Sequence, residues 1–173
     1  QPAGTVVEWT EEALSVLAFL HEQHIIHRDI KPSNLLVDGQ SRLKLADLGL
    51  AGRLDRLDDP VGGTVGVGTP GYMAPEHAAG ADPTPAWDLY GLGATLRQLL
   101  SGVSPISERT PAPVPDSCPR WLRQFVDRLL DHPSRRQLRG RPRSPVVRPP
   151  LGEQLRRKRQ DRRVLPKRWK LHE

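Results

Sequence analysis

Four polar residues at short spacing could together handle a phosphate group and a metal ion. Asp29 and Asn34 lie five positions apart in a polar loop, and Asp47 follows a short distance along the chain. Two carboxylates and an amide supply the hard oxygen ligands that Mg²⁺ takes, with water and phosphate completing its shell. Lys31, two positions after Asp29, can stabilise a phosphate. The set predicts metal-assisted phosphoryl transfer.

A β-hairpin is predicted between the polar loop and Asp47. Residues 35–37 and 43–45 are short apolar runs typical of strands, and Asp38-Gly39 between them is typical of a turn. The polar loop then stands at the entrance of the hairpin and Asp47 at its exit. Because a two-residue turn brings the two ends together, we expect the three oxygen-bearing side chains to converge.

Three helices are predicted around this hairpin, so the expected fold is mainly α with a small β-hairpin. The first is expected to run from Thr10, its N-cap, to about His24, after a lead-in over 1–7. The second has Thr84 as its N-cap and runs from Pro85 to the terminating Gly102, and the third runs from Trp121 to Leu130. The second helix is apolar on nearly every side, which is typical of a buried helix. Gly91 and Gly93 within it indicate the close approach of a neighbouring backbone.

Three motifs in this order resemble those of protein kinases. Residues 27–34, His-Arg-Asp-Ile-Lys-Pro-Ser-Asn, are similar to the catalytic loop of that family. Residues 47–49 resemble its metal-binding Asp-Phe-Gly, with Leu48 in place of Phe, and residues 74–76 match the Ala-Pro-Glu that closes its activation segment. The resemblance covers roughly residues 8–136 and implies a kinase-like C-terminal lobe with the N-lobe absent.

The resemblance implies a Ser/Thr protein kinase that uses ATP and Mg²⁺ on a protein substrate. Asp29 would accept the proton of the substrate hydroxyl, and Lys31 would steady the γ-phosphate. Asn34 and Asp47 would hold Mg²⁺ and so contribute to nucleotide binding. Lys31 followed by proline, and Thr69 preceded by glycine, are similar to the Ser/Thr branch. Thr69 would bridge Asp29 and Lys31 beside the substrate; the alternative is an ordinary turn residue.

Further positions carry regulatory or structural roles by the same resemblance. Arg28 resembles the arginine that binds a phosphate on the activation segment, and Thr64 is the nearest hydroxyl for that phosphate. The alternative for Thr64 is a solvated loop residue. Asp88, a carboxylate in an apolar helix, would accept backbone hydrogen bonds near His27 and Arg28. His27 is expected to be a packed structural residue.

A buried ion pair is also implied. Glu76 and Arg136 resemble that pair of the family, and Arg135 is an adjacent rival for the arginine. The structural positions implied by the resemblance are His27, Leu48, Gly49, Glu76, Asp88 and Arg136.

Charge is unevenly distributed along the chain. Residues 1–134 hold 17 acidic and 11 basic side chains, a net of −6, whereas residues 135–173 hold 3 acidic and 15 basic ones, a net of +12. We therefore divide the chain into the C-lobe portion of a kinase domain, 1–136, and a basic Arg/Pro-rich tail, 137–173. The tail is expected to be disordered or partly helical over 151–165. It could bind nucleic acid or an acidic membrane, be a solvated end, or result from a shifted reading frame.

The remaining composition limits the setting of the protein. A single cysteine, Cys118, excludes an internal disulfide and agrees with a reducing, cytoplasmic location. The chain has no run of about 18 apolar residues, so a transmembrane segment is not predicted within it. Membrane attachment through segments outside this chain stays open.

A kinase also needs an N-lobe to hold ATP, and this chain is too short before the catalytic loop to contain one. Only 26 residues precede His27, whereas five strands and a helix need at least ~60. The first lysine in the chain is Lys31, so the N-lobe lysine is missing. We expect the chain alone to transfer phosphate negligibly, with activity in the complete protein. The alternative is a non-catalytic kinase remnant that binds partners through its C-lobe and basic tail.

Overall fold

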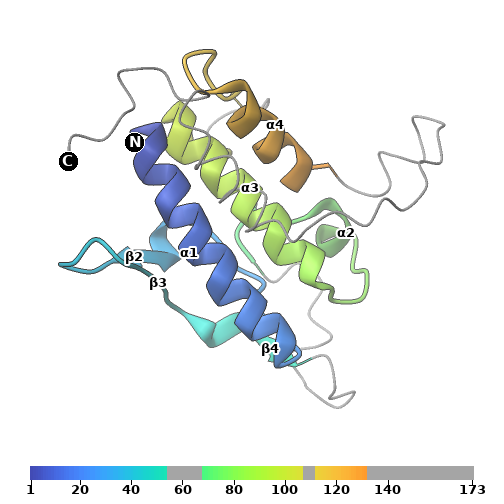
Figure 1. The fold of residues 1–173 in the computed structure, drawn as a ribbon. Helices are drawn as coiled ribbons and strands as arrows, with labels where there is room; N and C mark the ends of the chain where they lie inside the picture. Colours follow the sequence, from blue (N-terminus) through green and yellow to red (C-terminus); the bar gives the residue numbers. More distant parts are fainter. Residues whose placement is uncertain (54–67, 107–111, 132–173) are drawn as a thin grey trace, which may run out of the picture.

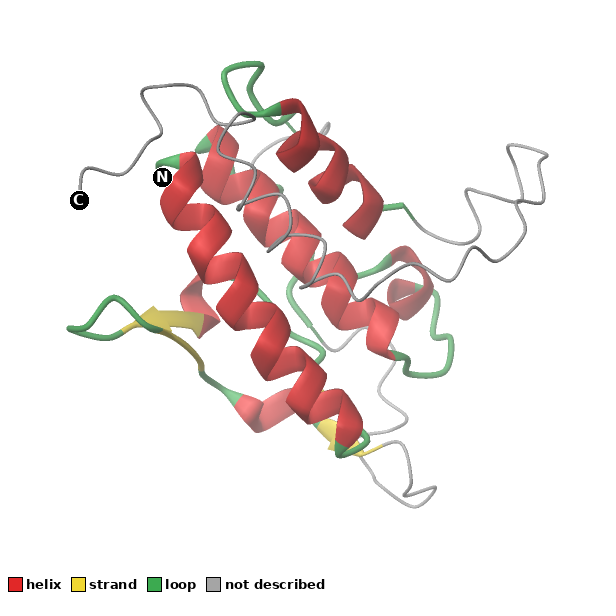
Figure 2. Cartoon of the chain, viewed as in Figure 1, coloured by secondary structure: helices red, strands yellow, loops and turns green. Residues whose placement is uncertain are grey.

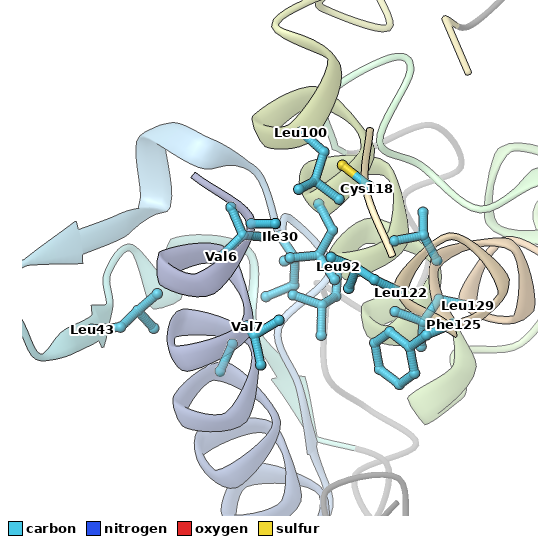
Figure 3. Close-up of a cluster of buried hydrophobic side chains, with 14 of the residues drawn as sticks. Val6, Val7, Ile30, Leu43, Leu92, Leu100, Cys118, Leu122, Phe125 and Leu129 are labelled. Carbon is cyan, nitrogen blue, oxygen red and sulfur yellow. The ribbon is translucent and has the colours of Figure 1, made fainter. Parts of the chain in front are cut away.

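Three long helices form the body of the structure, a computed structural model that describes residues 1–53, 68–106 and 112–131 (Figure 1). They are α1 (Ala3–Glu22), α3 (Pro85–Ser101) and α4 (Arg120–Leu129), and a short α2 (Pro75–Ala78) precedes α3. α3 packs against both α1 and α4 and lies between them. The buried apolar side chains of the three helices meet around Leu92 and Leu122, both fully buried (Figure 3).

Two small antiparallel sheets lie beside α1, and the described residues are otherwise helix and loop (Figure 2). β1 (Ile25–Ile26) pairs with β4 (Gly52–Arg53), and β2 (Leu35–Val37) pairs with β3 (Leu43–Leu45). Short 3₁₀ turns, Pro32–Asn34 and Leu48–Leu50, precede β2 and follow β3. The fold is therefore mainly α with a small β-hairpin, as the sequence predicts.

The first helix begins earlier than predicted. α1 starts at Ala3, so the lead-in over 1–7 and the capping role of Thr10 are both wrong. Val6 and Val7 are buried and extend the apolar stripe backward, so tertiary packing favours helix here. Thr10 is fully buried inside the helix, and its Oγ1 donates to the Val6 carbonyl at 2.6 Å.

The hairpin has the predicted strands but a longer turn. Leu35 pairs with Leu45 and Val37 with Leu43, so residues 38–42 form the connection in place of the predicted two-residue turn. Asp38 Oδ1 stabilises this connection by accepting the N–H groups of Gln40 at 2.9 Å and Arg42 at 3.0 Å. The hairpin ends are still adjacent, because the Ala46 N–H donates to the Asn34 carbonyl at 2.8 Å.

A carboxylate of α1 ties the hairpin to the helical body. Glu12 Oε2 accepts the backbone N–H of Leu43 at 2.5 Å, across 31 residues of sequence. The Leu43 side chain is buried in the core. This contact fixes the position of β3 and therefore of the residues that follow it.

The other two long helices agree with their predicted bounds. α3 runs from Pro85 to Ser101 with Thr84 at the N-cap position, although the Thr84 side chain makes no capping bond. Gly102 ends it in the left-handed region at φ 78°. A Cβ added at Gly93 would lie 2.8 Å from the Cβ of Leu129, so this glycine lets α4 approach α3.

No described helix combines the length and apolar character needed to cross a membrane. The basic tail 137–173 and its helix candidate lie outside the described residues.

Candidate active site

Asp29 is the centre of a hydrogen-bonded cluster near the hairpin entrance. Its Oδ1 accepts the hydroxyl of Thr69 at 2.7 Å and the Thr69 N–H at 3.1 Å. Its Oδ2 lies 2.6 Å from Lys31 Nζ and accepts Asn34 Nδ2 at 3.3 Å. Lys31 Nζ also donates to Thr69 Oγ1 at 2.8 Å. Thr69 thus bridges Asp29 and Lys31, which is the arrangement implied by the resemblance.

The environment of Asp29 keeps its carboxyl ionised. Burial alone would raise the pKa of Asp29, which is only 5% exposed. Hydrogen bonds from Lys31 and Thr69, the charge of Lys31 and the bond from Asn34 outweigh burial, so the pKa lies below its ordinary value. At neutral pH the cluster therefore presents a charged acceptor, and not a carboxylic acid.

The two predicted magnesium ligands have different surroundings. Asn34 is buried, and its Nδ2 donates to the Asp29 carbonyl at 2.8 Å. Its Oδ1, the oxygen available to a cation, accepts the Ser33 hydroxyl at a long 3.5 Å. Asp47 is exposed and adopts the left-handed conformation at φ 63°, with its Oδ1 accepting the Gly49 N–H at 3.2 Å. Among described residues, Asp47 makes no hydrogen bond to Asp29 or Asn34. A direct contact is therefore seen between Asp29 and Asn34, and the shared magnesium site of Asn34 and Asp47 stays a prediction.

The backbone before Asp29 is fixed by a buried carboxylate from α3. Asp88 is 1% exposed, and its two oxygens accept the backbone N–H of His27 at 2.9 Å and of Arg28 at 2.8 Å. These are the hydrogen bonds implied by the resemblance. Arg28 has a φ of 72°, a conformation that costs energy in a non-glycine residue, so these bonds hold a strained peptide in place.

Asp88 has a third partner that sequence reasoning missed. His21 Nε2 lies 2.8 Å from Asp88 Oδ2, and the His21 side chain is 17% exposed. The sequence offers little sign of this contact, because 67 residues separate the two side chains. His27 itself is fully buried, with Nε2 3.1 Å from the Ala46 carbonyl, which agrees with a packed structural role.

One face of α3 is directed at the candidate site. Asp88, Gly91, Thr95 and Gln98 recur at intervals of three or four residues, so they lie along one side of the helix. A Cβ at Gly91 would lie 3.1 Å from both the Cβ and the carbonyl oxygen of Ile30. This close approach accounts for a glycine in a helix, as the sequence indicates.

The last two residues of this face also reach loops of the site. Thr95 Oγ1 donates to the Ile30 carbonyl at 3.3 Å. The hydroxyl of Tyr72, a buried residue three positions after Thr69, donates to Gln98 Oε1. Sequence reasoning singled out Asp88 but neither Thr95 nor Gln98. Their helical spacing from Asp88 is the signal that could have found them.

A stacked aromatic pair lies under the Thr69 segment. The rings of His77 and Trp87 are parallel within 7° and 3.8 Å apart between centroids. Both residues are buried, and a Cβ at Gly68 would lie 3.5 Å from His77 Cε1. The pair therefore supports the backbone that leads into Thr69, and neither ring was predicted to belong to the site.

Some of the predicted residues can be placed only in part. Arg28 is 9% exposed, and its guanidinium packs against Gly52 so closely that a Cβ there would clash. Thr64 and Arg136 lie outside the described residues, so the phosphate site and the ion pair with Glu76 stay predictions. Leu48 is exposed at 54%, and Gly49 after it is also exposed.

Three large apolar side chains of the hairpin and its exit are exposed, beside the exposed Arg42 and Lys44. Leu36, Val37 and Leu48 are 54%, 44% and 54% exposed. Large apolar side chains scattered singly on a surface are common, but these three belong to one hairpin and its exit.

No group of three or more His, Cys, Asp or Glu side chains suited to a metal ion occurs in the described part of the chain. A cation here would depend on one carboxylate, one amide oxygen and external ligands.

Comparisons with known proteins agree with the geometry. The family model of the protein kinase domain matches residues 2–137. The chain is 34% identical over 135 residues to the proline-rich receptor-like protein kinase PERK15 of Arabidopsis thaliana, covering 73% of this chain and 26% of that protein. It is 30% identical over 149 residues to the serine/threonine-protein kinase PknA of Mycobacterium tuberculosis, covering 79% and 34%.

A third relative shows how small a part of these proteins the chain represents. This chain is 39% identical over 112 residues to the cytokinesis protein sepH of Aspergillus terreus, and the match covers 65% of this chain and 8% of that protein. The chain therefore spans at most about a third of the length of these three relatives.

Proposed function

The chain belongs to the protein kinase family, and from this we propose that its complete protein transfers the γ-phosphate of ATP to serine or threonine hydroxyls of a protein substrate. The observation that carries the proposal is the saturated carboxylate of Asp29. Four donors from Lys31, Asn34 and Thr69 converge on its two oxygens. A carboxylate accepts about four hydrogen bonds, so an incoming hydroxyl must replace one of them.

Lys31 is the donor that a substrate hydroxyl can replace most easily. Its side chain is 23% exposed and flexible, whereas Thr69 donates partly from its backbone and Asn34 is buried. Once displaced from Asp29, the ammonium of Lys31 can move to the phosphate. The substrate oxygen then bonds to phosphorus as the bond to ADP breaks, and its proton goes to Asp29. The ammonium offsets negative charge on the transferred group.

Asn34 and Asp47 are proposed to hold Mg²⁺. The donor set fits a hard cation, because both offer oxygen and the Asn34 amide is oriented by its bond to the Asp29 carbonyl. When bound, Mg²⁺ would neutralise charge on the phosphates of ATP. Arg28 is proposed to bind an activating phosphate, with Thr64 as its candidate carrier.

The Ser/Thr preference is supported by the contacts of Thr69. Its hydroxyl and N–H fix Asp29, and the hydroxyl also accepts from Lys31. Lys31 and Thr69 are also the residues whose sequence context, before proline and after glycine, is similar to the Ser/Thr branch. The two side chains meet in this cluster.

The adenine side of the nucleotide is proposed to bind a separate N-lobe of the complete protein. The exposed apolar side chains of Leu36, Val37 and Leu48 are the features of the described residues that suit contact with such a lobe. In this proposal residues 1–136 are the C-lobe portion of the kinase domain and 137–173 a basic tail. The chain alone is then a poor catalyst, because it positions the hydroxyl but holds the nucleotide weakly.

The test is phosphotransfer from labelled ATP by the native-length protein isolated from its source cells. Asp29→Asn is expected to lower kcat by about 10²- to 10⁴-fold, the usual contribution of a general base. Asp82→Asn, an exposed carboxylate outside the cluster, is the matched control and should leave kcat unchanged. Phosphoamino acid analysis should find phosphoserine or phosphothreonine.

Other outcomes would contradict the proposal. Phosphotyrosine as the sole product would refute the Ser/Thr preference. Full activity of the Asp29→Asn protein, or no activity in the native-length protein, would refute catalysis by this cluster. The second result would favour the alternative of a non-catalytic kinase remnant that binds partners.

A further inference from the structure

Thr95 places a hydroxyl in the most deeply buried part of α3. It is fully buried, and Leu92, three residues before it, and Leu96, directly after it, are 0% and 1% exposed. A buried hydroxyl without a hydrogen bond is costly, so its partner identifies what the residue is for. A second fully buried threonine, Thr10 in α1, offers a direct comparison within the same molecule.

The two threonines use their hydroxyls differently. Thr10 donates to Val6, four residues earlier in its own helix, which is the local bond common for helical threonines. Thr95 donates to the carbonyl of Ile30, which is 65 residues away in the catalytic loop. The Thr10 bond therefore concerns only α1, whereas the Thr95 bond joins α3 to the candidate site.

The acceptor of this bond lies between the two residues that the reaction needs. Ile30 follows Asp29 and precedes Lys31, so its peptide groups connect both side chains of the cluster. Gly91, one helical turn before Thr95, leaves only enough space for the Cβ and carbonyl of Ile30. The Ile30 residue is therefore held by packing against Gly91 and by the hydrogen bond from Thr95.

The contact also completes a series of supports along α3. Asp88 fixes the N–H groups of His27 and Arg28, which precede Asp29. Thr95 fixes the carbonyl that follows Asp29. The catalytic loop is thus attached to one rigid helix on both sides of its central carboxylate. A small shift in such a carboxylate can lower a reaction rate substantially.

We propose that Thr95 is a positioning residue, whose hydroxyl holds the Ile30 peptide so that Asp29 and Lys31 keep their mutual geometry. Its effect on catalysis rests on the proposed function, but its effect on the cluster does not. The residue touches neither substrate nor nucleotide in this role. It acts through the backbone of the loop.

The first readout is independent of activity and uses the 173-residue chain. The Thr69 N–H donates to Asp29 Oδ1, so its hydrogen exchange measured by NMR reports whether the carboxylate stays in place. Thr95→Val and Thr95→Ala both remove the hydroxyl, and each should speed this exchange about fivefold, the effect of one lost hydrogen bond. Thr95→Ser keeps a hydroxyl and should restore most of the protection.

Thr10→Val is the matched control, because it removes an equally buried hydroxyl that makes only a local bond. It should lower overall stability comparably and leave the relative exchange of Thr69 unchanged.

The second readout is kinetic and uses the native-length protein. Loss of the Thr95 hydroxyl should lower kcat about fivefold to tenfold with little change in KM for the protein substrate. If Thr95→Val and Thr95→Ala behave like Thr10→Val in the exchange of the Thr69 N–H, the proposal is overturned, whatever the activity. If the exchange separates the variants while Asp29→Asn is fully active, the positioning role stands and the proposed function fails.

Discussion

The buried and exposed halves of the candidate site differ in how they are supported. Asp29 is 5% exposed and receives donors from Lys31, Asn34 and Thr69. Asp47 is exposed, and its described hydrogen bond is to Gly49, two residues along the chain. Asp29 thus receives donors from its own loop and from the distant Thr69, whereas the described bond of Asp47 is entirely local.

The two halves differ in support because different helices contact them. α3 supports the Asp29 half through one face, beginning with Asp88 and its bonds to the loop backbone. The Asp47 half is attached through the hairpin, which Glu12 joins to α1 at Leu43. We infer that the Asp29 half is preorganised in this chain, whereas the Asp47 half takes its final geometry when the proposed nucleotide and metal bind.

The largest expected effect compares two Asp→Asn substitutions. Both oxygens of Asp88 accept hydrogen bonds, so an amide nitrogen at this position would face an N–H donor of the catalytic loop. Asp88→Asn should lower the free energy of unfolding by about 3 kcal/mol. Asp47→Asn keeps a side chain tolerant of the left-handed conformation and should change it by less than about 0.5 kcal/mol.

Urea denaturation of the two variants and the parent chain measures both values. Equal losses of stability in the two variants would mean that the two halves are supported to the same degree. The contrast between a buried and an exposed half would then be wrong.

A smaller effect is expected from adding one methyl group to a glycine in each half. Gly91→Ala would press on the backbone of Ile30 at 3.1 Å, and this crowding outweighs the gain in helix propensity. The net destabilisation should be about 1 kcal/mol. Gly39→Ala, in the hairpin turn, meets no atom within 4 Å and should change stability by less than about 0.5 kcal/mol. A stabilised Gly91→Ala chain would show that the loop and α3 are not tightly packed.

The smallest effect concerns the pH dependence of stability. Asp29 has a lowered pKa in the folded chain, so its ionised form contributes stability above the unfolded carboxyl value of about 3.9, and this contribution is lost as the pH falls. Thr69→Val removes one donor to Asp29 Oδ1 and should raise the pKa of Asp29.

The stability difference between the Thr69→Val chain and its parent should therefore be greatest near pH 7 and shrink below about pH 4. Urea unfolding at several pH values measures this dependence. Thr95→Val should act in the same direction if both residues serve the Asp29 half. A difference that grows as the pH falls would mean that the hydroxyl of Thr69 does not favour the ionised carboxylate.

The sequence was sufficient to predict elements whose ends carry strong local signals. Pro85 and Gly102 bound α3, and the apolar runs around Asp38 became the paired strands. Thr10 was misleading because a capping residue type followed by two glutamates also fits a helix interior. There Thr10 bonds back to Val6, and the packing of earlier valines decides where the helix begins.

The central residues of the candidate site were predictable, but the residues that support them were mostly not. The spacing of the motif brought Asp29, Lys31 and Asn34 together, because they lie within one short loop. The supports of this loop came from distant segments, as the bonds of His21 to Asp88 and of Thr95 to Ile30 illustrate. Contacts across more than 60 residues depend on helix packing, which local spacing does not encode.

The bond between Glu12 and Leu43 also bears on solubility. A short hairpin presents open N–H groups along its outer edges, and such an edge is a template for pairing with a strand of another molecule. Glu12 occupies the Leu43 N–H and places a negative charge beside it. The carboxylate that locates the hairpin thus also denies β3 a third strand at that position, which disfavours aggregation by strand addition.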